Sequence, residues 1–192
     1  MTGTISLLFV SLVAVPLSLF AQSSDVAPAR ASAPTPANPI SVSQAKVYTM
    51  LSGVVIAAAE KMPEENYSFR PTDSVRSFGQ LVGHLADSQY YFCSSVSDES
   101  KPSGSVEKTK TSKADLVSAL KEAVAYCGRA YASMTDAKGS EMTKVMNMDM
   151  AKLAALGVNT AHDYEHYGNM VTYMRIKGIV PPTSEKSPGA TK

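Results

Sequence analysis

Three histidines are the residues of this chain whose type and spacing could do chemistry. They are His84, His162 and His166, and the chain has no others. His162 and His166 are separated by one helical turn, so in a helix they share a face and can hold one ion through two imidazoles. If a helix carrying His84 packs beside them, all three are predicted to bind one divalent metal ion. By ligand type we expect Zn²⁺ or Ni²⁺ first, with Cu and Fe left open.

The neighbours of the histidines predict a cleft beside the core of the protein. On a helical wheel of ~100° per residue, each histidine lies roughly 120–160° from the main apolar stripe of its helix. Such a position fits a cleft, although it also fits exposure to solvent. The residues predicted to line the cleft or to support the ligands are Asp87, Tyr91, Asn159 and Tyr173. Asp87 follows His84 by one turn and could accept its second N–H, as carboxylates often do for ligand histidines.

The chemistry of the site follows from the number of ligands. Three imidazoles leave at least one coordination position open, which is typical of a catalytic rather than a structural metal site. Asp163 and Glu165 are further candidates for supporting the ligands, but we expect both to be solvated charges. The sequence contains no Ser-His-Asp arrangement and no Gly-rich phosphate loop, and it assigns no catalytic residue.

Four helices are predicted to position these residues. Apolar residues recur at helical spacing over residues 43–61, 74–94, 113–134 and 147–177, and no alternating run is long enough to predict a strand. Four such helices must bury their apolar stripes against one another, which predicts an all-α four-helix bundle. The loop at 95–112 has about 18 residues, whereas bundle connections usually have 2–8. It could return along a helix of ~30 Å, so we expect a crossover that leaves the second and third helices parallel.

The two cysteines test that crossover. Cys93 lies near the end of the second predicted helix, and Cys127 lies in the second half of the third. In an antiparallel hairpin they would be roughly 17 Å apart along the helix axes, too far for a bridge. Parallel helices bring them level. A Cys93–Cys127 disulfide therefore accompanies the crossover in this prediction, with two buried thiols as the alternative.

The N-terminal segment predicts export. Residues 5–20 are apolar and carry no charged side chain, but the run is short for a bilayer span of roughly 20 residues. We expect a signal peptide over residues 1–21, a Pro/Ala-rich linker over 22–40, the bundle over 41–182 and a flexible tail over 183–192. An uncleaved anchor and a buried helix are the alternatives. The mature protein is then periplasmic or secreted, without a stable membrane span.

Two sequence blocks resemble a known family. GHLAD contains His84, and HDYEHYGN begins at His162. With the segment NYSFRPT, they are similar to the DinB-like (damage-inducible) superfamily, and the resemblance extends over about residues 43–182. It implies a four-helix bundle with a crossover and metal ligands at positions that match His84, His162 and His166. Some relatives are thiol-dependent S-transferases or isomerases that use zinc, nickel or another divalent ion, and many have no assigned reaction.

The net charge of the chain argues against one class of function. A formal net charge of +1 argues against nucleic-acid binding, which rests on clustered Lys and Arg. We expect an exported metal-dependent hydrolase or transferase whose small-molecule substrate is unknown. Export favours the hydrolase, because low-molecular-weight thiol cofactors are mainly cytoplasmic. A non-catalytic bundle that binds a metal or small ligand is the alternative, a bundle for protein association is a third, and a homodimer is left open.

Overall fold

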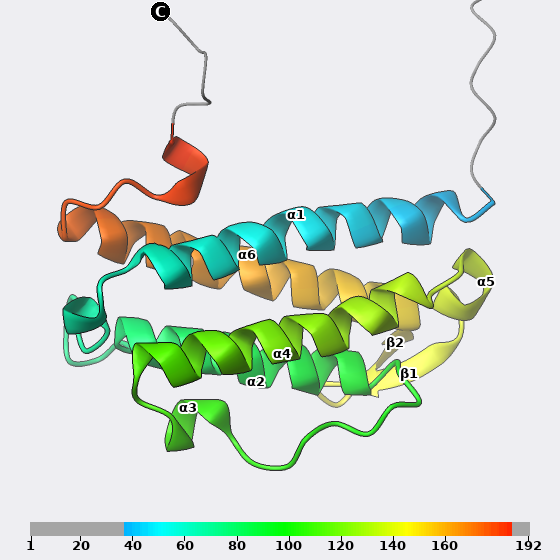
Figure 1. Ribbon diagram of the computed structural model, residues 1–192. Coiled ribbons are helices and arrows are strands. Elements are labelled where there is room, and N and C mark those ends of the chain that lie inside the picture. Colours follow the sequence, from blue (N-terminus) through cyan, green and yellow to red (C-terminus); the bar gives the residue numbers. More distant parts are fainter. Residues whose placement is uncertain (1–36, 186–192) are drawn as a thin grey trace, which may run out of the picture. The chain divides into compact units, whose positions relative to one another are not determined.

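The computed structural model describes residues 37–185, and four long helices form its bundle (Figure 1). These are α1 (Pro39–Lys61), α2 (Phe78–Ser94), α4 (Lys113–Ala132) and α6 (Lys152–Ile176). The shorter elements are η1 (Glu64–Asn66), α3 (Val106–Thr109), α5 (Asp136–Gly139), β1 (Met142–Val145), β2 (Met148–Ala151) and η2 (Pro182–Ser184). The prediction of a four-helix bundle is confirmed.

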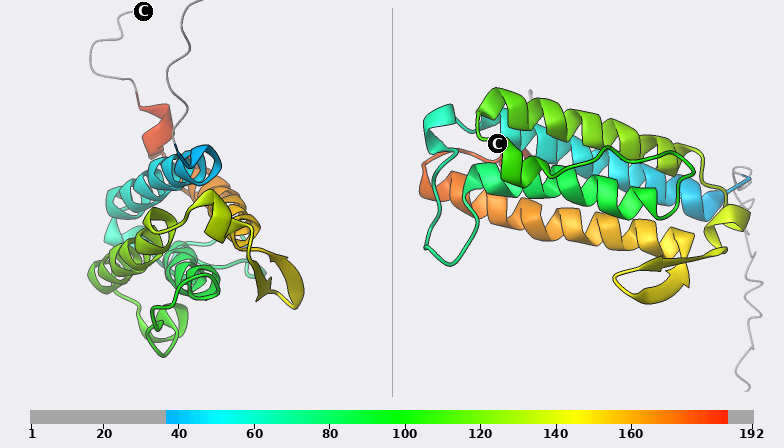
Figure 2. Two further views of the ribbon diagram at one scale, coloured as in Figure 1. Left: turned by 90° about the vertical axis from the view of Figure 1, so that its right-hand side faces the viewer. Right: turned by 90° about the horizontal axis from the view of Figure 1, so that it is seen from below.

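The helices form a ring in which each packs against two others. α1 contacts α4 and α6, and α2 contacts the same two helices from the other side. α2 and α4 run in one direction, and α1 and α6 run in the other, as both side views show (Figures 1 and 2). The predicted crossover is therefore present, and it includes α3, which packs against α2.

The helix boundaries differ from the predicted ones at two places. α2 begins at Phe78 rather than at residue 74, because Ser77 and Gln80 form a capping box in which each side chain bonds the other's main-chain N–H. α6 begins at Lys152 rather than at residue 147. The residues before it form a β-hairpin, in which Val145 pairs with Met148. The prediction that the chain contains no strand is wrong at this hairpin.

Large apolar side chains fill the middle of the bundle. Those of Leu51, Phe78, Leu85, Leu120 and Met170 are all fully buried and come from all four long helices. Side chains of this kind typically cost about 2–5 kcal/mol of stability when they are truncated to alanine. Their burial fixes α2 against α6, the two helices that carry the histidines.

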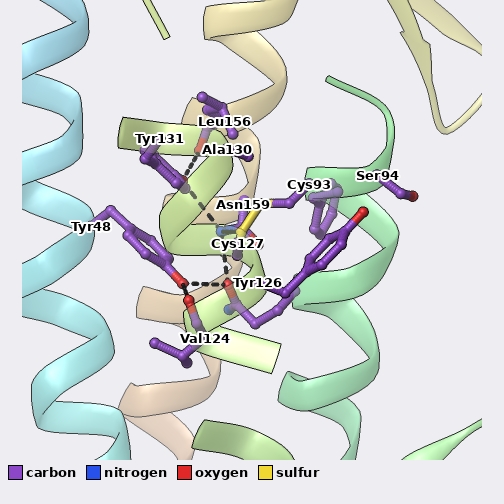
Figure 3. The surroundings of a disulfide bond; sticks show 12 residues. Tyr48, Cys93, Ser94, Val124, Tyr126, Cys127, Ala130, Tyr131, Leu156 and Asn159 are labelled. Carbon is purple, nitrogen blue, oxygen red and sulfur yellow. Dashed lines mark hydrogen bonds between the residues drawn. A yellow bond between two sulfur atoms is a disulfide. The ribbon is translucent and has the colours of Figure 1, made fainter. Parts of the chain in front are cut away.

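A second buried cluster surrounds the two cysteines (Figure 3). Cys93 on α2 and Cys127 on α4 form a disulfide whose Cα atoms are 5.2 Å apart, within the usual range for a bridge. Asn159 and Tyr131 lie beside it, and Tyr48 stacks on Tyr131 with ring centroids 4.0 Å apart. The bridge joins the two parallel helices at one level.

The ends of the chain are described only in part. The predicted signal peptide at 1–21, most of the linker and residues 186–192 lie outside the described residues. α1 begins at Pro39, inside the segment that we predicted as linker. Within residues 37–185, α1 alone is long and apolar enough to cross a membrane by length and composition. Its face with Leu51, Val55 and Ala58 is buried in the bundle.

Candidate metal centre

The three histidines converge between α2 and α6. His84 comes from the middle of α2, and His162 and His166 come from successive turns of α6. The Nε2 atom of His162 lies 3.1 Å from that of His84 and 3.1 Å from that of His166. Three nitrogens bound to one ion at about 2.0–2.1 Å would be separated by roughly 3.0–3.4 Å. The donor set therefore fits one transition-metal ion held through Nε2.

Burial keeps the imidazoles in the form that binds a metal. Burial, together with the neighbouring His166 and His84, lowers the pKa of His162 to about 4. Burial is also the main reason why the pKa values of His84 and His166 lie below their usual range. Neutral imidazoles have a free lone pair on one nitrogen, which is the state required of a metal ligand.

The other ring nitrogen of His84 faces a carboxylate from the crossover. Its Nδ1 lies 3.4 Å from Oε2 of Glu107, and the other oxygen of Glu107 accepts a 2.9 Å hydrogen bond from Arg76 Nε. Such a carboxylate favours the tautomer with a proton on Nδ1 and leaves Nε2 free to bind. Glu107 therefore has the supporting role that the sequence analysis gave to Asp87.

The crossover can approach His84 closely because residue 83, directly before this histidine, is a glycine. A Cβ atom on Gly83 would lie 2.7 Å from the Cα atom of Glu107, closer than real Cβ atoms approach. Sequence analysis missed Glu107, since its distance from His84 along the chain hides their contact. The available signals were the length of the 95–112 loop and the glycine in the GHLAD block.

Asp87 supports the site indirectly. Its carboxylate accepts hydrogen bonds from the Ser105 hydroxyl at 2.6 Å and from the main-chain N–H groups of Val106 and Glu107 at 2.7 and 3.1 Å. These contacts use both oxygens to hold the start of α3. Asp87 thus positions the segment that carries Glu107, and the structure gives no direct hydrogen bond between Asp87 and His84.

The two histidines on α6 have different outer surroundings. The amide of Asn169 lies 3.3 Å from His166 Nδ1, and with its oxygen turned toward the ring it would accept the Nδ1 proton. His162 Nδ1 is buried and has no hydrogen-bond partner among the described residues. His166 is only 7% exposed, so it lies on the buried face of α6, where the helical wheel did not place it.

A cleft of about 650 Å³ opens beside the histidines. Ten residues line it: His84, Asp87, Ser88, Tyr91, Phe92, Met146, Val158, Ala161, His162 and Glu165. Its volume lies in the range of small-molecule sites. The structure thus places Tyr91, Asp87 and Glu165 at the cleft, and it adds Met146 from the hairpin turn, which the sequence analysis did not consider.

Two residues predicted for the cleft lie elsewhere in the bundle. Asn159 is two turns before His166, and its amide nitrogen donates to Gln89 Oε1 and to the Tyr131 hydroxyl, both at 3.2 Å. Tyr173 is two turns after His166 and donates a 2.9 Å hydrogen bond to the Arg76 carbonyl. Each shares a helix face with His166, but seven residues correspond to ~10 Å along the helix. Height therefore separates Tyr173 from the site. Asn159 lies at the level of Val158 and Ala161, which line the cleft, but it is fully buried and faces the core instead.

Asp163 is buried, although we expected a solvated charge. It is 1% exposed, and burial raises the pKa of its carboxyl group to about 7. The Gln89 amide donates a 2.7 Å hydrogen bond to one of its oxygens. Asp163 therefore belongs to the interior of the bundle, whereas Glu165 is exposed at the cleft.

Comparison with known proteins identifies the family. Residues 52–170 match the model of the DinB superfamily, so the chain belongs to this superfamily. The match contains all three histidines and the crossover. A search of curated proteins finds no match.

Three solved structures share the fold at low sequence identity. A DinB-like protein from Bacillus cereus has a TM-score of 0.65 at 15% identity, covering 72% of this chain and 93% of its own. A DinB-like protein from Bacillus subtilis has a TM-score of 0.60 at 18% identity, with 76% and 99% covered. YfiT from Bacillus subtilis has a TM-score of 0.57 at 18% identity, with 72% and 88% covered. Its structure is described as that of "a probable metal-dependent hydrolase with an unusual four-helix bundle topology".

Proposed function

We propose that this protein binds one divalent metal ion, Zn²⁺ or Ni²⁺, through His84, His162 and His166, and uses it to hydrolyse a small molecule. The observation that carries the proposal is the convergence of three Nε2 atoms beside a cleft, with the His162 atom 3.1 Å from each of the others. The description of YfiT as a metal-dependent hydrolase on the same fold supports it.

The chain's own side chains would prepare the site for such a reaction. A bound divalent ion supplies Lewis-acid polarisation and makes a nearby water more acidic. Glu107 holds the Nδ1 proton of His84, which directs the Nε2 lone pair toward the shared point. Glu165 contributes the exposed carboxylate at the cleft, where it is placed to accept a proton. Apolar walls around the cleft lower its polarity and strengthen these electrostatic effects.

Turnover by metal-loaded protein tests the proposal. Tag-free protein should hydrolyse at least one member of a panel of small esters and amides, lose the activity with a chelator and recover it when Zn²⁺ or Ni²⁺ is returned. His162→Ala should abolish it, whereas Tyr164→Ala, an exposed change on the same helix, should not. Activity that requires an added thiol would identify a transferase instead. Bound metal with no turnover would favour the non-catalytic binding protein.

We also propose that the protein is exported, by cleavage near residue 21. The uncharged apolar run at residues 5–20 supports this, and so does the Cys93–Cys127 pair, since disulfides persist mainly in oxidising compartments. Mass spectrometry of protein recovered from the periplasm or medium should show the loss of residues 1–21. An intact N-terminus in a cytosolic fraction would overturn the proposal.

A further inference from the structure

The wall of the cleft is chiefly apolar beside the histidines. Tyr91 and Phe92 come from α2, and Val158 and Ala161 come from α6. Met146 from the hairpin turn completes the same wall. A ligand group that fills this space gains stability by removing apolar surface from water, so the cleft favours a branched aliphatic or aromatic group.

The charges at the cleft have one sign. Asp87 and Glu165 are its charged residues, and no Lys or Arg of the described range lines it. Asp87 is held by three donors, while Glu165 is exposed. The nearby cation Arg76 is paired with Glu107. A carboxylate on the part of the ligand that points away from the metal would therefore meet like charge with no Lys or Arg beside it, whereas an uncharged or cationic group there would not.

Met146 occupies a backbone conformation that suits other residues better. It and Asn147 form the two-residue turn of the hairpin, with φ values of 51° and 62°. Turns of this kind prefer Asn, Asp or Gly at both positions, because a larger side chain is unfavourable at positive φ. Met146 is also 57% exposed. Both the positive φ and the exposure to solvent are unfavourable for a long apolar side chain at this position. Its presence there points to a function.

The turn is fixed to the helix that carries His84. The Met146 N–H donates a 3.1 Å hydrogen bond to the Tyr91 hydroxyl. Within β1, three residues before Met146, the Thr143 hydroxyl donates a 2.6 Å hydrogen bond to the Ser95 carbonyl. These bonds hold the turn beside α2, where the Met146 side chain lines the cleft.

We infer that the cleft selects an uncharged or cationic small molecule with an aromatic or branched apolar group, and that Met146 contacts that group. The polar part of the molecule would reach the histidines. This inference rests on the proposed metal function, and it adds the class of ligand and a residue that determines specificity. It disfavours carboxylate-bearing thiols as co-substrates.

A series of hydroxamates tests the ligand class, because one metal-binding group can carry different tails. Calorimetric titration of Zn²⁺-loaded protein should show benzohydroxamate binding on the order of tenfold more tightly than acetohydroxamate. The 4-aminomethyl derivative should bind at least as tightly as benzohydroxamate, and the 4-carboxy derivative more weakly. Equal affinity for the acetyl and benzoyl compounds, or tightest binding of the carboxylate, would overturn the inference.

Two matched variants test Met146. Met146→Asn should keep or raise the melting temperature, since Asn suits the turn, and should lose most of the preference for the phenyl ring. Met142→Asn changes another exposed methionine of the hairpin that does not line the cleft, and it should keep the preference. An unchanged preference in Met146→Asn would refute the role of this residue.

Metal content measured on the same samples separates the two proposals. Protein that takes up neither zinc nor nickel overturns the proposed function and this inference with it. Protein with one zinc per chain but no selectivity among the hydroxamates overturns this inference alone.

Discussion

Two polar clusters of the bundle, one around Asn159 and one formed by the three histidines, differ in what their polar atoms face. In the first, Asn159 donates to Gln89 and to Tyr131, and the Tyr48 hydroxyl hydrogen-bonds Gln89 as well. These partners are all supplied by the bundle, beside the disulfide. In the second, three histidines direct their Nε2 atoms toward one another. A neutral imidazole has only one N–H, so rings that carry this proton on Nδ1 leave Nε2 as an acceptor without a donor.

The difference separates a structural role from a binding role. A polar cluster whose members bond one another fixes the packing of helices, and its loss leaves buried groups unpaired. A cluster whose acceptors converge beside an open cleft is completed by something outside the chain. We therefore expect changes in the first cluster to lower stability without affecting metal, and changes in the second to affect metal first.

Loss of the disulfide should give the largest effect on stability. The double change Cys93→Ala with Cys127→Ala opens a bridge between residues that are 34 apart in sequence. The chain-entropy model gives a loss of roughly 3–4 kcal/mol in the free energy of unfolding, measurable by urea denaturation. Metal content should not change. Wild-type protein in reductant provides the control, and a loss under about 1 kcal/mol would contradict a constraining bridge.

Asn159→Leu should destabilise the first cluster by a smaller amount. The change leaves Gln89 and Tyr131 without the amide that donates to them. Buried groups left unpaired typically cost about 1–3 kcal/mol, which chemical denaturation can measure. If this variant also loses its metal, the two clusters are not independent and the comparison fails.

Glu107→Ala should lower the metal affinity of the histidine cluster without abolishing binding. Loss of a carboxylate that supports a ligand histidine typically lowers metal affinity by about 10–100-fold. Competition with a chelator of known affinity measures the change, and Glu122→Ala, an exposed change on α4, is the control. Equal affinities in the two variants would show that Glu107 does not support His84.

Asp136 lies outside both clusters and should affect only the acid stability of the bundle. Hydrogen bonds from the main-chain N–H of Ser41, and then of Ile40, hold the pKa of Asp136 below its usual range. Because the folded pKa is depressed, this contribution is present above the unfolded pKa of ~3.9 and is lost as pH falls through the folded value. Asp136→Asn should lower the melting temperature slightly at pH 7 and show a weaker acid dependence. If the melting temperatures of the variant and the wild type fall by the same amount between pH 7 and pH 3, this prediction is wrong.

Much of the fold could be predicted from the sequence because it depends on local spacing. Helical periodicity places the long helices, and one long loop together with Cys93 and Cys127 indicates the parallel pair. The hairpin was missed because its strands have only four residues each and its turn is Met146-Asn147 rather than the usual Asn-Gly. Its influence on the start of α6 could not be seen from apolar periodicity alone.

The three histidines of the candidate site could be predicted from the sequence, whereas their surroundings could be predicted only in part. One helical turn between His162 and His166 is a local fact, whereas the contact of Glu107 with His84 depends on the path of the crossover. Tyr173 was misplaced because a helical wheel gives direction and not height. Asn159 was misplaced because its side chain turns toward Gln89 and Tyr131 in the core, although its neighbours Val158 and Ala161 line the cleft. Tertiary packing decides which level of a helix face opens into a cleft.

Metal content of tag-free protein tests the central claim most directly. Elemental analysis after dialysis should find one divalent ion per chain in the wild type and in Asn159→Leu, and none in His166→Ala. We expect this because three Nε2 atoms converge on one point, whereas the Asn159 amide donates to Gln89 and Tyr131 and not to the histidines. Stoichiometric metal retained in His166→Ala would contradict the assignment of the site.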